Sequence, residues 1–213
     1  VDFCSDARLT VDNMGKFHEK FDPHGQTPTM VLHNGDLSYA MGYAHIWDLF
    51  FDMIEPLAKK FAWMVSVGNH ERDAPDSGNT YGNNDSGGEC AVPTLTRFRM
   101  PWSSGPDRRH PHDEPWYSFE FGPVHFVMLA TEMHLLGAQR NWLENDLKNV
   151  DREKTPWIVV SAHRPMYISS AWHRSGDKSA DYPFAEHMQQ AYENLFIKHK
   201  VDISFGAHHH SYQ

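Results

Sequence analysis

Apolar residues recur along the chain in two patterns, one typical of amphipathic helices and the other of buried strands. Helical spacing of apolar residues predicts four helices, over residues 6–21, 44–60, 138–150 and 184–199. Short apolar runs predict four strands, over residues 29–33, 63–67, 157–161 and 201–205. Two further strand-like runs, 116–121 and 125–130, flank Gly122-Pro123 and predict a hairpin. Because helices and strands alternate, the pattern predicts a layered α/β domain with parallel strands and right-handed crossovers.

Two stretches lack this periodicity. Residues 72–115 are rich in Gly, Pro, Asp, Asn and Ser, which predicts a long and mostly irregular segment. Segments of that length are uncommon inside a domain unless they carry function. A shorter irregular stretch covers residues 168–183. We therefore expect these two stretches to shape a binding pocket.

Composition narrows the classes of function. A chain of 213 residues with 40% apolar and 13% aromatic content can bury one sizeable core, so we expect residues 1–213 to form a single domain. The formal charge of −9 and the dispersed Lys and Arg residues argue against nucleic-acid binding, which needs a basic surface. Neither a membrane span nor a signal peptide is visible in the sequence. The 16 histidines favour metal chemistry, because imidazole is the commonest nitrogen ligand of transition metals.

Polar clusters follow four of the predicted strands directly. They are Gly35 to Tyr39, Gly68 to Glu71, Ser161 to Pro165 and Ala207 to His210. The carboxyl ends of the strands form the ligand crevice of an open α/β sheet, so we expect the four clusters to converge on one rim. A glycine before Asp36 and before Asn69 permits the tight turn that presents each side chain.

The predicted rim offers a set of oxygen and imidazole donors. They come from Asp36, Tyr39, Asn69, His163, His208 and His210. Such donors without thiolate suit Fe, Mn or Zn, and Cys4 and Cys90 are too few for a zinc cluster, although the sequence leaves open whether they pair. A carboxylate and an amide oxygen can each bridge two cations, and metal pairs about 3.5–4 Å apart are the usual arrangement for phosphoryl hydrolysis. Each residue alone is more often structural, and only the combination favours a metal site.

Four of these stretches also occur as an ordered motif series in a known family. GDLSYA, SVGNHE, VVSAHRPMY and HHHSYQ resemble the motifs of the calcineurin-like metallophosphoesterases, and the GDxxY spacing resembles the purple acid phosphatases among them. Further stretches, YGNNDSGGECAVP, RFRMPWSS, VHFVMLATE and LENDLKNVDREKTPWIVV, are similar to plant-type and protist-type members. The resemblance runs from about Thr10 to the end of the chain. It implies a four-layer αββα sandwich with mixed sheets and the site at the carboxyl ends of the strands.

The resemblance assigns a role to each matching residue. Asp36 would bridge two metals, and Tyr39 and His210 would hold a ferric ion. The second, divalent metal, which would be Zn, Mn or Fe, would be held by Asn69, His163 and His208. The position between the two ligand histidines, His209, would be a spacer.

Two further histidines would face the substrate by the same resemblance. His70 would contact the phosphoryl oxygen or protonate the leaving group. His173, ten residues after His163, falls where several family members carry a second substrate-facing histidine. Beside His70, Glu71 and Arg72 either orient the loop or form a surface salt bridge.

Two departures from the family pattern stand out. The Asp-x-Gly motif that supplies a ferric-site carboxylate is missing, and its tempting substitutes, Asp6 and Asp12, fall on the first predicted helix. We therefore expect that motif and the first strand to precede residue 1, and closing strands to follow Gln213, so that residues 1–213 are one catalytic domain without the family's N-terminal β-sandwich. Ala207 stands where the family has glycine, which predicts a crowded turn.

The resemblance implies an acid phosphatase that hydrolyses phosphate monoesters through a metal-bound hydroxide at a binuclear centre. The partner would be a small-molecule phosphate ester, without nucleic acid or membrane, and the location would be secreted, vacuolar or lysosomal. One alternative is a phosphodiesterase or nucleotide pyrophosphatase on the same scaffold. The other is a non-catalytic fragment, because the ferric-site carboxylate is missing.

Overall fold

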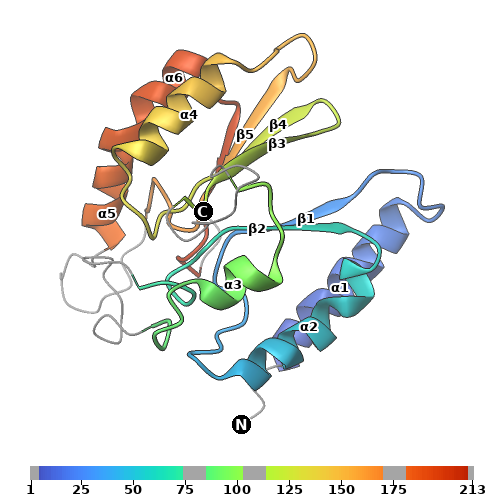
Figure 1. The fold of residues 1–213 in the computed structure, drawn as a ribbon. Coiled ribbons are helices and arrows are strands. Elements are labelled where there is room, and N and C mark those ends of the chain that lie inside the picture. Colours follow the sequence, from blue (N-terminus) through green and yellow to red (C-terminus); the bar gives the residue numbers. More distant parts are fainter. Residues whose placement is uncertain (1–4, 74–84, 103–113, 170–180, 211–213) are drawn as a thin grey trace.

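A computed structural model of the chain describes residues 5–73, 85–102, 114–169 and 181–210. Strands occupy the middle of the molecule and helices lie on both outer sides (Figure 1). The helices are α1 (Ser5–Phe21), α2 (Ala44–Ala58), α3 (Val92–Arg97), α4 (Ala138–Lys148), α5 (Asp181–Met188), the π-helical turn η1 (Gln189–Glu193) and α6 (Asn194–His199). The strands are β1 (Met30–His33), β2 (Ala62–Val65), β3 (Tyr117–Phe121), β4 (Val124–Met128), β5 (Trp157–Ser161) and β6 (Ile203–Phe205).

The strands form two sheets of different composition. One sheet pairs β1 with β2 in parallel, and the other has the order β3-β4-β5-β6. In the second sheet β3 runs antiparallel to β4, whereas β4, β5 and β6 are parallel. Figure 1 shows α1 and α2 on the side of the small sheet and α4, α5 and α6 on the side of the large one. The mixed α/β architecture expected from the sequence is therefore confirmed.

Two apolar cores hold these layers together, and the large sheet lies between them. Successive side chains of a strand point to opposite faces, so neighbouring residues of β4 serve different cores. Met128 packs in the core that includes Trp47 of α2, while Val127 packs in the core that includes Leu143 of α4. All four side chains are buried: Met128, Val127 and Leu143 are 0% exposed, and Trp47 is 1% exposed.

Element boundaries differ from the predicted ones where a strand loses its partner. β2 ends at Val65 and not at residue 67, because the last bond to β1 runs from the Ser66 amide to the His33 carbonyl at 3.1 Å. The last strand begins at Ile203 because the Asp202 carboxylate accepts the Ile158 amide at 2.8 Å and so replaces a ladder carbonyl. Within 72–115, the described residues include the short helix α3.

The predicted helix over 184–199 begins earlier, at Asp181, and contains a widened turn. Gln189 in that turn donates from Nε2 to the Met166 carbonyl at 2.8 Å, and Arg140 donates from Nε to the Ala191 carbonyl at 3.1 Å. π-Helical turns expose carbonyls that an α-helix would occupy, and they are frequent near functional sites. Here the turn anchors the segment that follows β5, which carries a predicted ligand.

Arg152 ties the end of α6 to the large sheet. Its Nη1 donates to the Pro156 carbonyl at 2.7 Å and to Asp202 Oδ2 at 2.9 Å. Its Nη2 donates to the His199 carbonyl at 2.8 Å and to the Lys200 carbonyl. The guanidinium therefore satisfies carbonyls that the helix itself leaves without partners.

Replacing Arg152 by alanine is expected to lower the free energy of unfolding by about 2 kcal/mol, because charged hydrogen bonds are each worth about 1.5–3 kcal/mol and this side chain is one-third exposed. Lys154→Ala is the matched control, since Lys154 is mostly exposed and solvent screens its ion pair with Glu120, so we expect a smaller loss. Urea unfolding of both variants measures the difference. Equal losses in the two variants would contradict the role given to Arg152.

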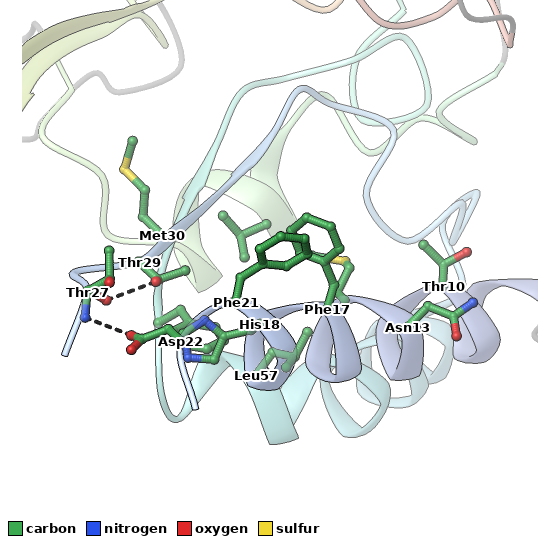
Figure 2. A pocket seen from close by; sticks show the side chains of 13 residues that line it. Thr10, Asn13, Phe17, His18, Phe21, Asp22, Thr27, Thr29, Met30 and Leu57 are labelled. Atoms are coloured by element: carbon green, nitrogen blue, oxygen red, sulfur yellow. Dashed lines mark hydrogen bonds between the residues drawn. The ribbon is translucent and has the colours of Figure 1, made fainter. Parts of the chain in front are cut away.

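An apolar groove of about 610 Å³ lies between α1 and the start of β1, as Figure 2 shows. Phe17 and Phe21 stand together on its helical side, and Asp22 accepts the Thr27 amide at 2.7 Å where the chain turns toward β1. None of the predicted metal ligands lines this groove. Separately, no helix in the described part of the chain is long and apolar enough to cross a membrane.

Candidate metal centre

Two tight turns at the carboxyl ends of β1 and β2 pack against each other. Gly35 has a φ of +82°, and a Cβ built on it would lie 2.6 Å from the Gly68 nitrogen. A Cβ on Gly68 would in turn lie 2.4 Å from Asp36 Oδ1. Both positions therefore require glycine, as the sequence predicts, and the contact brings Asp36 next to the turn that carries Asn69.

Glu71 fastens these two turns together. Its carboxylate accepts the backbone amides of Asp36 at 2.7 Å, Leu37 at 2.8 Å and Gly68 at 2.9 Å. The side chain is fully buried, so the alternative of a surface salt bridge is wrong for Glu71. Burial, and then the charge of Asp36, raise the pKa of the Glu71 carboxyl to about 8, whereas the three amides act in the opposite direction.

His163, at the end of β5, is fully buried and has a defined proton position. Its Nδ1 lies 2.7 Å from the Asn34 carbonyl, which can only accept, so Nδ1 carries the hydrogen. Burial lowers the pKa of His163 to about 4, so the ring is neutral near pH 7. The other ring nitrogen, Nε2, therefore presents a lone pair.

That lone pair of His163 faces other acceptors. Nε2 lies 2.9 Å from Asn69 Oδ1, 3.3 Å from Asp36 Oδ1 and 3.2 Å from His208 Nδ1. The amide of Asn69 cannot turn its nitrogen toward His163, because Nδ2 already donates to Asp85 Oδ2 at 2.8 Å. When His208 also presents a lone pair on Nδ1, these atoms converge with no proton between them and form a site that fits a cation. The possible ligand atoms of Asp36, His163 and His208 all lie within 4.8 Å of one another.

The second carboxylate oxygen of Asp36 belongs to a different group. Oδ2 accepts the Tyr39 hydroxyl at 3.1 Å, and that hydroxyl lies 3.4 Å from His210 Nε2. Burial, and then the charge of Asp36, raise the pKa of the Tyr39 phenol. Burial also opposes ionisation of Asp36, but attraction to the His163 and His70 rings, in their cationic forms, outweighs it, so the pKa of Asp36 is lowered. The two oxygens of the ionised Asp36 carboxylate thus face two separate groups of possible metal ligands.

His70 lies beside this second group. Its ring centroid is 4.2 Å from that of Tyr39, and its backbone amide donates to Asp36 Oδ1 at 3.1 Å. Nδ1 of His70 lies 3.1 Å from the Asp85 carbonyl, which places a hydrogen on that nitrogen. Asp85 therefore supports both Asn69 and His70. Sequence reasoning missed Asp85, because nothing in the irregular segment 72–115 distinguishes it from its polar neighbours.

The backbone at the site adopts an uncommon conformation. Asp36, Tyr39 and His208 have φ values of 53°, 52° and 61°, in the left-handed region that residues other than glycine rarely occupy. Such residues cluster at functional sites, where the surrounding structure enforces them. The expected crowding at Ala207 does not arise, since Ala207 is outside that region. The glycine that the turn requires is Gly206, where a Cβ would lie 2.7 Å from Pro165 Cα.

The structure thus brings seven of the eight predicted site residues into two adjoining groups. They are Asp36, Tyr39, Asn69, His70, His163, His208 and His210. The eighth, His173, lies outside the described residues, as do Cys4 and Tyr212. The substitutes for the missing motif, Asp6 and Asp12, are exposed on α1, as expected.

A mixed α/β fold with such a donor set at the carboxyl ends of its strands is typical of metallophosphoesterases. The model of the calcineurin-like phosphoesterase family matches residues 3–212, and the chain belongs to this family. The family uses a binuclear metal centre. A solved purple acid phosphatase, PPD1 from yellow lupin (Lupinus luteus) seeds, is 38% identical, with a TM-score of 0.70 over 90% of this chain and 32% of that one.

Curated relatives extend the resemblance to purple acid phosphatases. "Probable inactive purple acid phosphatase 9" of Arabidopsis thaliana is 41% identical over 87% of this chain and 30% of its own length. Purple acid phosphatase 22 of the same plant is 34% identical over 89% of this chain and 40% of its own length. A nucleotide pyrophosphatase/phosphodiesterase of Hordeum vulgare is 33% identical over 86% of this chain and 48% of its own length. The chain thus spans about a third to a half of the relatives it matches.

Proposed function

We propose that the protein is an acid phosphatase that hydrolyses phosphate monoesters at a binuclear centre. The observation that carries the proposal is the division of the Asp36 carboxylate, whose Oδ1 faces His163 while its Oδ2 faces Tyr39. A carboxylate in this position suits a bridge between two cations. Asn69, His163 and His208 would hold a divalent metal, and Tyr39 and His210 would hold iron(III).

The cations, when bound, would act as Lewis acids on the phosphoryl group and lower the pKa of water toward neutrality. The chain would position the substrate and move a proton. His70 carries a hydrogen on Nδ1, so its Nε2 can deliver a proton to the leaving oxygen only from the cationic ring. We propose this role for His70, and a contact with the substrate for His173.

The substrate class is tested by comparing rates on three substrates of the purified, metal-loaded protein. We expect a phosphate monoester to be hydrolysed faster than a diester and a diphosphate. The barley relative supports a second candidate, a nucleotide pyrophosphatase or phosphodiesterase, which predicts the reverse order. The names of several relatives include the word inactive, which supports a third candidate, a binding domain without turnover. Hydrolysis of none of the three substrates, with metal bound, would favour it.

Tyr39→Phe is expected to remove the visible absorption of the iron-loaded protein, because a phenolate bound to iron(III) is the proposed source of the colour. Tyr43→Phe is the matched control, since Tyr43 lies four residues away and is 63% exposed. An absorption spectrum of each variant at equal iron content measures the effect. The assignment of Tyr39 fails if its spectrum matches that of the control.

The remaining expectations rest on the resemblance alone. We propose a small phosphate ester as the substrate and a secreted, vacuolar or lysosomal location. Fractionation of the source tissue, followed by immunodetection, would test the location.

A further inference from the structure

Two neighbours of opposite chemistry compete for one nitrogen of His208. Asp181 Oδ1 lies 3.1 Å from His208 Nε2, and Arg164 Nη1 lies 3.1 Å from the same atom. A carboxylate can only accept a hydrogen bond, and a guanidinium can only donate one. Asp181 therefore favours a hydrogen on Nε2, whereas Arg164 favours a lone pair there. In the neutral ring these two neighbours select opposite tautomers. The lone pair on His163 Nε2, 3.2 Å from His208 Nδ1, acts in the same direction as Arg164, because it favours a hydrogen on Nδ1.

The guanidinium of Arg164 is held in place beside His208. It is 1% exposed, and Glu132 accepts from its Nε at 2.6 Å and from its Nη2 at 3.2 Å. Its amide donates to Thr131 Oγ1 at 3.1 Å, and its guanidinium lies 5.1 Å from the ring of Phe184. These contacts hold the guanidinium so that Nη1 lies 3.1 Å from His208 Nε2 and 3.7 Å from Asp181 Oδ1. The position of this donor is thus fixed.

The position of the hydrogen on Nε2 also decides whether Nδ1, on the other side of the His208 ring, has a free lone pair. Nδ1 of His208 lies 3.2 Å from His163 Nε2, inside the group of converging donor atoms. A hydrogen on Nε2 leaves the Nδ1 lone pair available to a metal, whereas a hydrogen on Nδ1 blocks it. The carboxylate of Asp181 is 16% exposed and lies in the first turn of α5, within reach of His208 but outside the ligand group.

We propose that Asp181 is a positioning residue that holds His208 in the Nε2–H tautomer against Arg164 and thereby makes His208 a metal ligand. The inference rests on the proposed metal centre. It adds that the second metal depends on a carboxylate that touches neither metal nor substrate. Without Asp181, Arg164 would donate to Nε2, and the ring hydrogen would move to Nδ1.

Zinc binding measures the consequence for the metal. Asp181→Leu removes the acceptor at similar volume. We expect the zinc affinity of the proposed divalent site, formed by Asn69, His163 and His208, to fall about 10–100-fold when it is measured by chelator competition. Asp181→Asn keeps an acceptor oxygen and should recover most of that loss. Glu186→Leu, an equivalent change at an exposed position of the same helix, should leave the affinity unchanged. Wild-type affinity in Asp181→Leu would overturn the proposal.

The tautomer itself is read from ¹⁵N-histidine spectra of the metal-free protein at pH 8, with the His208 signals assigned by their loss in His208→Gln. We expect Nε2–H in the wild type and Nδ1–H in Asp181→Leu, a change that loss of stability alone would not produce. Nδ1–H in the wild type would overturn the proposal even if Asp181→Leu failed to fold. Because this reading needs neither metal nor turnover, it stands or falls separately from the proposed hydrolysis.

Discussion

Asp36→Ala is expected to remove both metals and to lower the hydrolysis rate at least about 100-fold, since even the partners of metal ligands contribute about 10–100-fold. The reason is the position of the carboxylate, which contacts His163 through one oxygen and Tyr39 through the other. Metal content by mass spectrometry and the rate on a monoester measure the two effects.

Asp48→Ala is the control for this prediction. The Asp48 carboxylate is 72% exposed on α2 and forms a long ion pair with Arg97, at 3.6 Å. We expect its metal content and rate to equal those of the wild type. If Asp36→Ala kept one full equivalent of metal, the carboxylate would serve one site and not both.

Glu71→Ala is expected to lower the free energy of unfolding by at least about 3 kcal/mol, because a buried donor left without a partner costs about 1–3 kcal/mol. The substitution would leave the backbone amides of Asp36, Leu37 and Gly68 without the carboxylate that accepts their hydrogen bonds. Glu71→Gln keeps one acceptor oxygen, so its loss should be intermediate. Urea unfolding of the metal-free protein measures both.

Glu55→Ala gives the reference for losing an exposed carboxylate. Glu55 pairs with Lys59 one turn away on α2, and such a pair should contribute about 0.3–0.5 kcal/mol. A loss in Glu71→Ala no larger than in Glu55→Ala would show that other contacts fix the two turns.

The sequence was sufficient for the layers of the fold and for the convergence of the candidate ligands at the strand ends. Among the described residues, apolar periodicity located each helix except α3, since periodicity needs more than the six residues of that helix. The convergence of the candidate ligands was predictable because they directly follow strands. The turns after β1 and β2 must lie side by side once these strands pair in parallel. Gly35 and Gly68 approach each other closely because of that pairing.

The supporting residues could not be predicted in the same way. Two of the three amide partners of Glu71 lie 34 and 35 positions away along the chain, and Asp85 contacts Asn69 from a segment without periodicity. Asp181 was equally invisible, because its relation to His208 depends on where α5 begins. A carboxylate that binds buried amides and one that faces water look alike in a sequence. Only the tertiary contacts distinguish them.

Anomalous diffraction from crystals of the iron- and zinc-loaded protein, collected at both absorption edges, tests the central claim most directly. We expect two peaks about 3.5–4 Å apart, one on each side of Asp36, with iron near Tyr39 and His210 and zinc near Asn69 and His163. A single peak, or two peaks that do not share Asp36, would contradict the binuclear centre.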